Sequence, residues 1–243
     1  MTTIIYESKG RAREYSELAA NLYRGCDHGC VYCYAPRVTR QKKEAYIKPT
    51  VREGVINKFL NDAIELENKH EKRYVLLSFT TDPYMHLDER YQLTRKAIQI
   101  LLNHNLKVSI LTKGGLRSQR DFDLLASQPE NTMYGATLVF TDEKMRETIE
   151  PYAAPTDERI MMLKEAHEMG IFTYVSLEPV WDPKQSLKLI DTTHEYVDLF
   201  KVGKLNYHPQ QQNIDWKAFR ENIIHKMEEY GNDYYIKNDL MKY

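Results

Sequence analysis

The chain has three cysteines, Cys26, Cys30 and Cys33, and all of them lie in the short segment LYRGCDHGCVYCYAPRV at residues 22–38. Their C-x3-C-x2-C spacing places three thiolates in one loop. A closed zinc site takes four protein ligands, commonly as two separated pairs, whereas a [4Fe–4S] cluster held by three thiolates keeps one iron without a protein ligand. His28 could supply a fourth ligand, so zinc stays open as the alternative. The spacing favours a [4Fe–4S] cluster whose open iron serves catalysis.

The overall composition sets limits on partners and compartment. The 34 Lys and Arg residues nearly balance the 35 Asp and Glu residues, so any contact with nucleic acid must come from a local patch. The N-terminus lacks a basic segment followed by a long apolar run, and no apolar run elsewhere approaches the length of a membrane span. We therefore expect a cytoplasmic protein without a membrane partner. In a reducing compartment, three clustered cysteines are not expected to form disulfides.

The elements that must position the cysteines alternate between strand and helix. Short apolar runs predict buried strands, and spacings of three and four apolar residues predict amphipathic helices. This order predicts an α/β fold, a partial (β/α)6 TIM-type barrel of parallel strands with outer helices. We expect one domain over 1–243, with a core at about 15–205, a helical C-terminal extension at 206–243 that contains a closing helix at 213–230, and an unassigned tail at 233–240. The predicted strands lie at 21–23, 74–79, 107–111, 134–140, 172–177 and 198–203, and the predicted helices at 51–69, 91–104, 117–127, 156–168 and 184–194.

Three polar loops follow the first three predicted strands. They are the cysteine loop, TTDPY at 80–84 and TKGG at 112–115. In such barrels the chemistry sits where the carboxyl ends of the strands converge. The three loops are therefore expected to meet at one site.

The motifs around these loops resemble a known family. C-x3-C-x2-C with Tyr32 before the last cysteine is similar to the signature of the radical S-adenosylmethionine (SAM) superfamily. The segments KGRAREYSELAANLYRGCDHGCVYCYAP, SFTTDPYMHLDERYQLTR and VSILTKGGLRSQRDFDLL resemble the spore photoproduct lyase-like branch, also called DNA-repair-photolyase-like, over residues 9–205 and in the same order. The resemblance implies that Cys26, Cys30 and Cys33 hold a [4Fe–4S] cluster. SAM would bind its open iron and be cleaved reductively to a 5′-deoxyadenosyl radical.

The resemblance also implies contacts to SAM. Tyr32 would lie against the adenine, with shielding of the cluster as its alternative role, and Tyr34 could do either. Thr81 and Asp82 match the position that contacts the methionine amino group, although Asp-Pro is also an ordinary turn initiator. Lys113 matches a lysine that pairs with the methionine carboxylate.

Further candidates come from later strands. Thr137 and Ser176 match small hydroxyl residues near the ribose or methionine, with a purely structural role equally open. Glu178 could orient ribose hydroxyls or substrate, or only end its strand before a proline. Lys201 and Lys204 could also face the pocket and rank below Lys113.

The chain lacks one cysteine that the spore photoproduct lyases use. Spore photoproduct lyases use an additional cysteine, distant from the cluster, to return hydrogen to the product, and this chain has no such residue. Reversal of a thymine dimer is therefore in doubt.

The resemblance implies a low-potential electron donor of the flavodoxin or ferredoxin type. A basic run after the cysteine loop could meet phosphates of nucleic acid through Arg37, Arg40, Lys42 and Lys43, or it could simply be solvated.

The sequence thus predicts a radical SAM enzyme that abstracts hydrogen from an unidentified substrate, with a nucleotide or nucleic acid as one candidate. Two alternatives stay open. One is a non-catalytic module that binds zinc or a cluster and engages nucleic acid or a partner. The other is a relative that keeps the cluster but has lost turnover.

Overall fold

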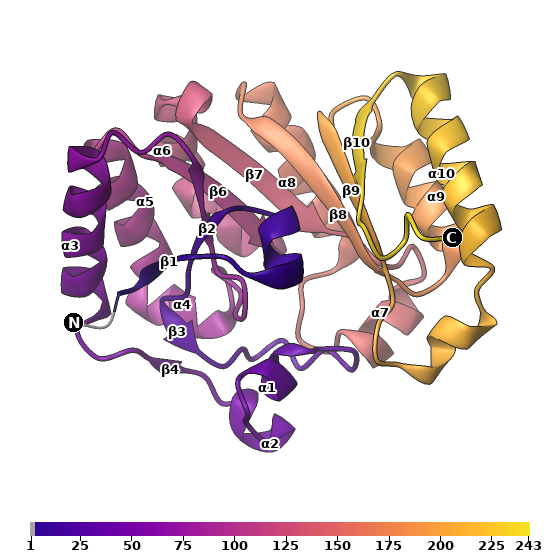
Figure 1. The fold of residues 1–243 in the computed structure, drawn as a ribbon, viewed down its shortest axis with the longest axis horizontal. Coiled ribbons are helices and arrows are strands. Elements are labelled where there is room, and N and C mark those ends of the chain that lie inside the picture. Colours follow the sequence, from indigo (N-terminus) through magenta and orange to yellow (C-terminus); the bar gives the residue numbers. More distant parts are fainter. Residues whose placement is uncertain (1–2) are drawn as a thin grey trace.

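The computed structural model describes residues 3–243 and is organised around an eight-stranded sheet with the strand order β1-β2-β5-β6-β7-β8-β9-β10 (Figure 1). The strands from β2 to β10 run parallel to their neighbours, and β1 pairs antiparallel with β2 at one edge. The strands of this sheet are β1 (Ile5–Glu7), β2 (Leu18–Ala20), β5 (Tyr74–Leu77), β6 (Lys107–Thr112), β7 (Thr132–Thr137), β8 (Phe172–Val180), β9 (Leu199–Lys204) and β10 (Asp233–Ile236). A separate two-stranded sheet joins β3 (Tyr23–Arg24) to β4 (Thr50–Val51).

Helices cover the outer face of the sheet, while the N-terminal segment crosses its other face (Figure 1). The outer helices bury one apolar stripe each; α3, for example, buries Val55, Phe59 and Ala63. The longer helices are α3 (Val55–Asn68), α5 (Leu93–Asn103), α8 (Thr156–Glu168), α9 (Pro183–Thr193) and α10 (Trp216–Tyr230). The shorter ones are α1 (Ala35–Val38), α2 (Lys43–Tyr46), α4 (His86–Tyr91), α6 (Phe122–Ser127), α7 (Glu143–Ile149) and the 3-10 helices η1 (Gly10–Glu14), η2 (Gly115–Asp121), η3 (Pro129–Asn131) and η4 (Pro209–Asn213).

The predicted α/β fold with a mostly parallel sheet and outer helices is confirmed, with corrections at its ends. The first parallel strand is Leu18–Ala20, which pairs with β5, and the prediction of 21–23 is wrong. Tyr23 instead pairs with Val51 in the small sheet. The short helix α4 is not among the predicted elements, and the predicted helix at 117–127 divides into the 3-10 helix η2 and α6. In the C-terminal segment, expected to be helical, the tail 233–240 contains β10, which adds a further parallel strand beside β9.

The two faces of the sheet differ in polarity because side chains alternate along each strand. Val175, Phe200 and Val202 are fully buried on the side of the helices. On the inner side, Thr137 pairs in register with Ser176, and Ser176 with Lys201. The inner face therefore carries hydroxyl and amino groups that could serve a ligand. Among residues 3–243, no helix has both the length and the apolar character needed to cross a membrane.

Candidate cluster and cofactor site

The cysteine loop follows β3 and is held by backbone hydrogen bonds from two directions. The Cys26 amide donates to the Tyr46 carbonyl at 3.0 Å, and the Val31 amide donates to the Ile149 carbonyl at 2.8 Å. Gly25 begins the loop with a φ of +84°, and a side chain there would place its Cβ 2.4 Å from the Tyr46 oxygen. Only glycine fits this left-handed turn against another backbone segment.

All three cysteines are free thiols; Cys30 is buried, and Cys26 and Cys33 are half-buried. Burial raises the pKa of Cys30 to about 12, while Lys113 nearby acts in the opposite direction. Burial also raises the pKa of Cys26 and of Cys33. Such thiols are poor nucleophiles on their own, because the thiolate is the reactive form. A bound metal deprotonates its thiol ligands, so this donor set fits metal ligation better than thiol chemistry.

The geometry of His28 bears on the zinc alternative. The His28 ring is buried, with Nε2 3.2 Å from the Arg117 guanidinium and Nδ1 3.6 Å from an Asp82 oxygen. Burial lowers its pKa to about 4. Nε2 is thus occupied by Arg117, while Asp82 lies near Nδ1 but beyond hydrogen-bond distance. Within residues 3–243 no three His, Cys, Asp or Glu side chains converge on a position for a single ion. A cubane, in which each thiolate binds a different iron, does not require such convergence.

Asp82 ties the loop after β5 to the loop after β6. Its Oδ1 accepts hydrogen bonds from the Thr112 hydroxyl at 2.6 Å and from the Tyr84 amide at 2.8 Å, and its Oδ2 accepts from the Lys113 amide at 2.7 Å. Burial alone would raise the pKa of Asp82, but His28 and these donors hold it below its usual value. The carboxylate predicted to meet SAM therefore positions the loops around Lys113.

The glycines after Lys113 allow this close approach of loops. A Cβ on Gly114 would lie 2.5 Å from the Tyr84 Cβ, and a Cβ on Gly115 would lie 2.5 Å from the Ala154 Cβ. The TKGG segment is thus required by packing as well as by its lysine.

Lys113 lies beside the cysteines and beside Tyr32. Its Nζ is 5.6 Å from the centre of the Tyr32 ring, and its charge acts on Cys30 and Cys33. This position is compatible with the predicted role of Lys113 as the partner of the methionine carboxylate. The Tyr32 hydroxyl donates a hydrogen bond to Glu150, so the ring is anchored below the cysteine loop.

Glu150 belongs to a fully buried ion pair that the sequence analysis missed. Its Oε2 lies 2.7 Å from Nη2 of Arg159, and the side chains are 0% and 1% exposed. These two atoms form an ion pair rather than an aligned hydrogen bond. Arg159 also donates to the carbonyls of Ala154 and Thr137 at 2.9 and 3.0 Å. Burial would raise the pKa of Glu150, but Arg159 and Lys113 together lower it.

The loop after β5 leaves polar atoms unused. The hydroxyl oxygens of Ser78 and Thr81 are buried and have no hydrogen-bond partner. The neighbouring backbone is well held, since the amides of Phe79 and Thr80 donate to Asn21 Oδ1 at 3.0 and 2.8 Å. An orphaned hydroxyl at Thr81 fits the predicted contact to a SAM amino group, because a buried polar group without a partner is costly.

On the inner wall, Ser176 and Glu178 meet Tyr15, a residue from the N-terminal segment. The Tyr15 hydroxyl lies 2.5 Å from Ser176 Oγ and donates to Glu178 at 2.7 Å. Lys237, which is 3% exposed, donates to the same carboxylate at 2.8 Å. Gly203 makes room for it, because a Cβ there would lie 2.6 Å from the Glu178 carboxyl carbon.

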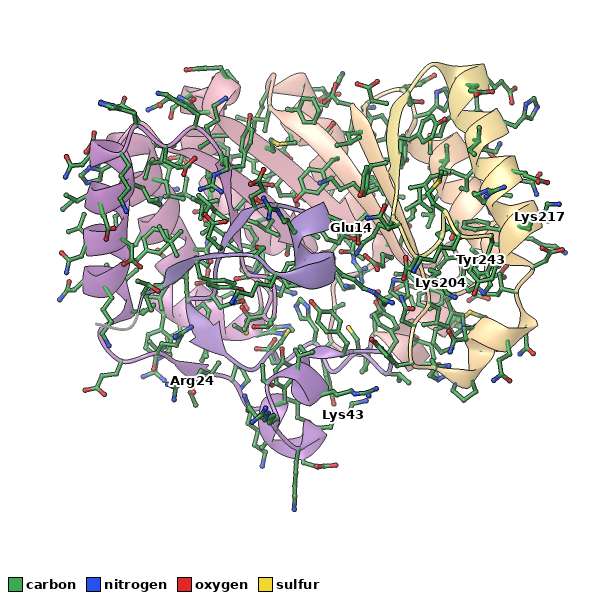
Figure 2. The ribbon with its side chains drawn as sticks, in the orientation of Figure 1. Glu14, Arg24, Lys43, Lys204, Lys217 and Tyr243 are labelled. Atoms are coloured by element: carbon green, nitrogen blue, oxygen red, sulfur yellow. The ribbon has the colours of Figure 1, made fainter. Side chains whose placement is uncertain are left out.

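The remaining predicted residues divide between the inner face and other surfaces. Thr137 is buried at the end of β7. Tyr34 is 40% exposed, and its hydroxyl donates to the Phe79 carbonyl at 3.1 Å. Lys201 faces inward, whereas Lys204 points to the C-terminal segment and donates to the Tyr243 hydroxyl at 2.6 Å (Figure 2). This opposite placement follows from their odd spacing along β9.

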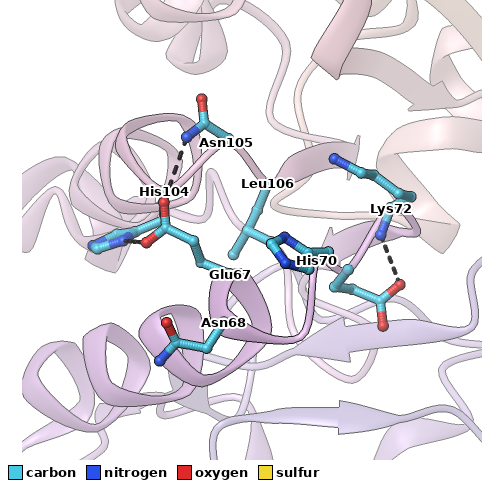
Figure 3. A pocket seen from close by; sticks show the side chains of 8 residues that line it. Glu67, Asn68, His70, Lys72, His104, Asn105 and Leu106 are labelled. Carbon is cyan, nitrogen blue, oxygen red and sulfur yellow. Dashed lines mark hydrogen bonds and ion pairs between the residues drawn. The ribbon is translucent and has the colours of Figure 1, made fainter.

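One hollow lies away from the cysteines, at the ends of α3 and α5 (Figure 3). It has a volume of about 700 Å³, and the side chain of His104 pairs there with Glu67 at 2.6 Å. Its lining holds none of the residues around the cysteine loop.

Sequence reasoning missed four members of the inner site, namely Tyr15, Lys237, Glu150 and Arg159. Tyr15 and Lys237 lie outside the polar loops that follow the predicted strands, one before the first parallel strand and one after the last. The sequence carries no comparable signal for Glu150 or Arg159, because both lie in a segment where buried residues are interspersed with exposed ones.

Residues 20–197 match the sequence model of the radical SAM superfamily. The chain belongs to this superfamily. Two uncharacterised relatives are ORF301 of Acidianus two-tailed virus, 28% identical over 74% of this chain and 61% of the relative, and MJ0683 of Methanocaldococcus jannaschii, 30% identical over 66% of this chain and 59% of the relative. This radical SAM chain therefore spans about three fifths of the length of these relatives.

Solved structures share the fold. A spore photoproduct lyase mutant with a dinucleoside spore photoproduct superposes with a TM-score of 0.73 and 14% identity, over 96% of this chain and 78% of that one. Streptococcus suis SuiB bound to S-adenosylmethionine gives a TM-score of 0.69 and 15% identity, over 90% of this chain and 50% of that one. At such identities the likeness shows the fold alone, which is the partial barrel predicted from the sequence.

Proposed function

We propose that this radical SAM protein is an enzyme that cleaves S-adenosylmethionine reductively at a [4Fe–4S] cluster held by Cys26, Cys30 and Cys33, and that it abstracts hydrogen from a substrate. The observation that carries the proposal is the set of three free thiols in one loop, one buried and two half-buried, with Lys113 acting on Cys30 and Cys33 and the Nε2 of His28 facing Arg117. When bound, the cluster supplies the electron that opens the sulfonium bond.

The chain's own residues would bind and orient SAM. Lys113 provides a positive charge for the methionine carboxylate, and Thr81 provides an unused hydroxyl. Ser176 and Glu178 line the inner wall and could meet the ribose. Tyr32, anchored on Glu150, would cover the cluster or the adenine. Asp82 would keep the Lys113 loop in register with these groups, and its Oδ2, which accepts one bond from the protein, keeps a lone pair for the methionine amino group.

The test is to assemble the protein anaerobically with iron and sulfide, add SAM and dithionite, and measure 5′-deoxyadenosine by chromatography. We expect the nucleoside from the wild-type protein and none from Cys30→Ala. One bound zinc and no iron would support the non-catalytic alternative. A full cluster that binds SAM but gives no 5′-deoxyadenosine, with or without added substrate, would indicate a relative without turnover. An electron donor of the flavodoxin or ferredoxin type would replace dithionite in the cell.

A nucleotide or nucleic acid is the substrate class we test first. Arg37, Arg40, Lys42 and Lys43 are all exposed in the segment after the cysteine loop, and Figure 2 places Lys43 at the edge of the molecule. The Arg37 guanidinium lies 4.8 Å from the centre of the exposed Tyr207 ring. Cations and aromatic faces of this kind suit phosphates and bases.

Removing the charges of Arg40, Lys42 and Lys43 together, with Ser at each position, is expected to weaken binding of a single-stranded DNA oligonucleotide by about tenfold at low salt. The magnitude of the slope of log affinity against log salt should fall by about 2, because a protein that makes fewer phosphate contacts releases fewer counterions on binding. Fluorescence anisotropy at several salt concentrations measures both quantities.

The matched control removes three exposed lysines on outer helices, with Ser at Lys164, Lys184 and Lys217. These changes should leave both affinity and salt slope as in the wild type. Equal losses in the two triple variants would mean that the basic run is merely solvated and has no dedicated partner.

A further inference from the structure

We propose that a second pocket, on the inner side of the sheet below Tyr15, binds a small organic anion with Lys201 as its counter-ion. The pocket has a volume of about 360 Å³, which lies within the usual range for small-molecule sites. It is built from the N-terminal segment and from five neighbouring strands of the sheet. Its lining consists of Arg13, Tyr15, Ser16, Glu17, Arg73, Tyr74, Ser109, Met133, Tyr174 and Lys201.

Lys201 contributes an ammonium group without an acidic partner. Its Nζ donates to the backbone carbonyl of Tyr15 at 2.9 Å and reaches that of Glu14 at 3.5 Å. The rings of Tyr15 and Tyr174 lie 5.4 and 5.7 Å from it. No carboxylate among residues 3–243 forms an ion pair with this lysine. An anionic ligand would stabilise this half-buried ammonium, because its negative charge would offset the cost of removing the ammonium from water.

The other cations of the pocket are already neutralised. Arg13 pairs with Glu17 at 3.0 Å, and Arg73 pairs with Glu7, Glu17 and Glu71 at 2.9, 3.2 and 2.7 Å. Of the three cations that line the pocket, Lys201 is therefore the one available to a ligand.

Lys237 is another ammonium whose positive charge acts on Lys201. It donates to Glu178 at 2.8 Å and lies 4.0 Å from Glu14, so it occupies both neighbouring carboxylates. Burial, together with the charge of Lys237, lowers the pKa of Lys201 to about 8. An anion bound in the pocket would relieve both effects.

Hydroxyl groups beside Lys201 complete an anion site. The Ser109 and Tyr174 hydroxyls lie 3.1 Å from each other, and one of them has a proton left to donate to a ligand. The Tyr174 ring can occupy this position because Gly135 opposite it has no side chain; a Cβ there would lie 2.4 Å from the ring. Met133 and the tyrosine rings offer apolar surface to a carbon skeleton. A carboxylate or a phosphate ester of a small molecule matches this combination.

The pocket is separate from the proposed SAM contacts, although it is close to them. Lys201 pairs in register with Ser176, and Tyr15 turns its hydroxyl to Ser176 and its backbone carbonyl to Lys201. Tyr15 thus forms the wall between the two. The proposal does not depend on SAM cleavage, and its test measures binding alone.

The experiment titrates the cluster-assembled protein with inorganic phosphate and, separately, with malonate by calorimetry at constant ionic strength set by chloride. We expect saturable binding of one anion per chain. Binding of phosphate alone would identify a phosphate ester as the ligand class, and binding of malonate alone would identify a carboxylate. Lys201→Met should raise the dissociation constant of the anion at least about tenfold. Lys201→Arg should keep most of the wild-type affinity because it keeps the positive charge.

The matched control is Lys226→Met, which removes a lysine paired with Asp191 on the outer helices and should not change the affinity. A second measurement needs no variant, namely the ¹³Cε resonance of Lys201 followed against pH. Its titration midpoint should rise when the anion is present, since a bound negative charge favours the ammonium form. The proposal is overturned if neither anion binds above the effect of chloride, or if Lys201→Met binds as tightly as the wild type.

Discussion

Glu150→Gln is expected to lower the free energy of unfolding by about 3 to 5 kcal/mol, because it leaves the guanidinium of Arg159 buried without its negative partner. Arg159 is 1% exposed and has no route to water that would spare this cost. The Tyr32 hydroxyl would also lose its charged acceptor. Urea denaturation followed by circular dichroism measures the change.

The control for this prediction is Glu65→Gln, which breaks the exposed pair with Lys69 and should not measurably move the unfolding midpoint. The pH dependence provides a second check. Arg159 and Lys113 hold the pKa of Glu150 below its usual value, so its contribution is present above the unfolded-state pKa of about 4 and is lost as the pH falls through the folded-state pKa. The stability gap between wild type and variant should therefore narrow below about pH 4. A gap that stays constant into acid would show that the charge of Glu150 does not matter.

Asp82→Asn is expected to destabilise the protein by about 2 to 3 kcal/mol. An asparagine oxygen can replace Oδ1, but its NH₂ group then faces the Lys113 amide, which loses its acceptor. A buried donor left unsatisfied costs about 1 to 3 kcal/mol, and hydrogen bonds to a charged group are at the upper end. The Lys113 loop would also shift relative to the cysteines. SAM affinity should fall along with stability.

Asp123→Asn is the comparison for this substitution, since Asp123 is exposed and pairs with Arg95 at 2.7 Å. We expect a change within about 0.5 kcal/mol. Equilibrium dialysis with labelled SAM separates the two effects of Asp82→Asn, because the measurement can be made under conditions where both variants are fully folded. Unchanged SAM affinity there would mean that Asp82 only stabilises the turn.

The sequence predicts the central part of this fold well for a physical reason. The buried strands are continuous apolar runs and their helices carry regular apolar stripes, as in KVSIL before TKGG. The errors lie where these signals are weak. Leu18–Ala20 is a short strand with two alanines, and β10 is Asp233–Ile236, where polar and aromatic residues mix. Only pairing with a neighbour already in place makes them strands.

In the candidate site, too, features that are local in sequence can be predicted, whereas contacts between distant segments cannot. Spacing alone is enough to propose Cys26, Cys30 and Cys33 as ligands, because candidate ligands within one loop are local in sequence. Contacts between distant segments are not encoded in any spacing. Tyr15 meets Ser176 across 161 residues and Tyr32 meets Glu150 across 118, so these partners follow only from the folded sheet. Asp82 was predicted as a cofactor contact, and the structure shows in addition how its carboxylate holds two loops together.

The central claim is that three thiolates and no fourth ligand leave one iron free for S-adenosylmethionine. The most direct test is electron paramagnetic resonance of the dithionite-reduced protein, recorded with and without SAM. We predict the signal of a reduced [4Fe–4S] cluster that changes its g values when SAM is added, since the ligand would bind the cluster itself. A cluster signal that SAM leaves unchanged, or a protein that holds zinc and takes up no iron, would contradict this account.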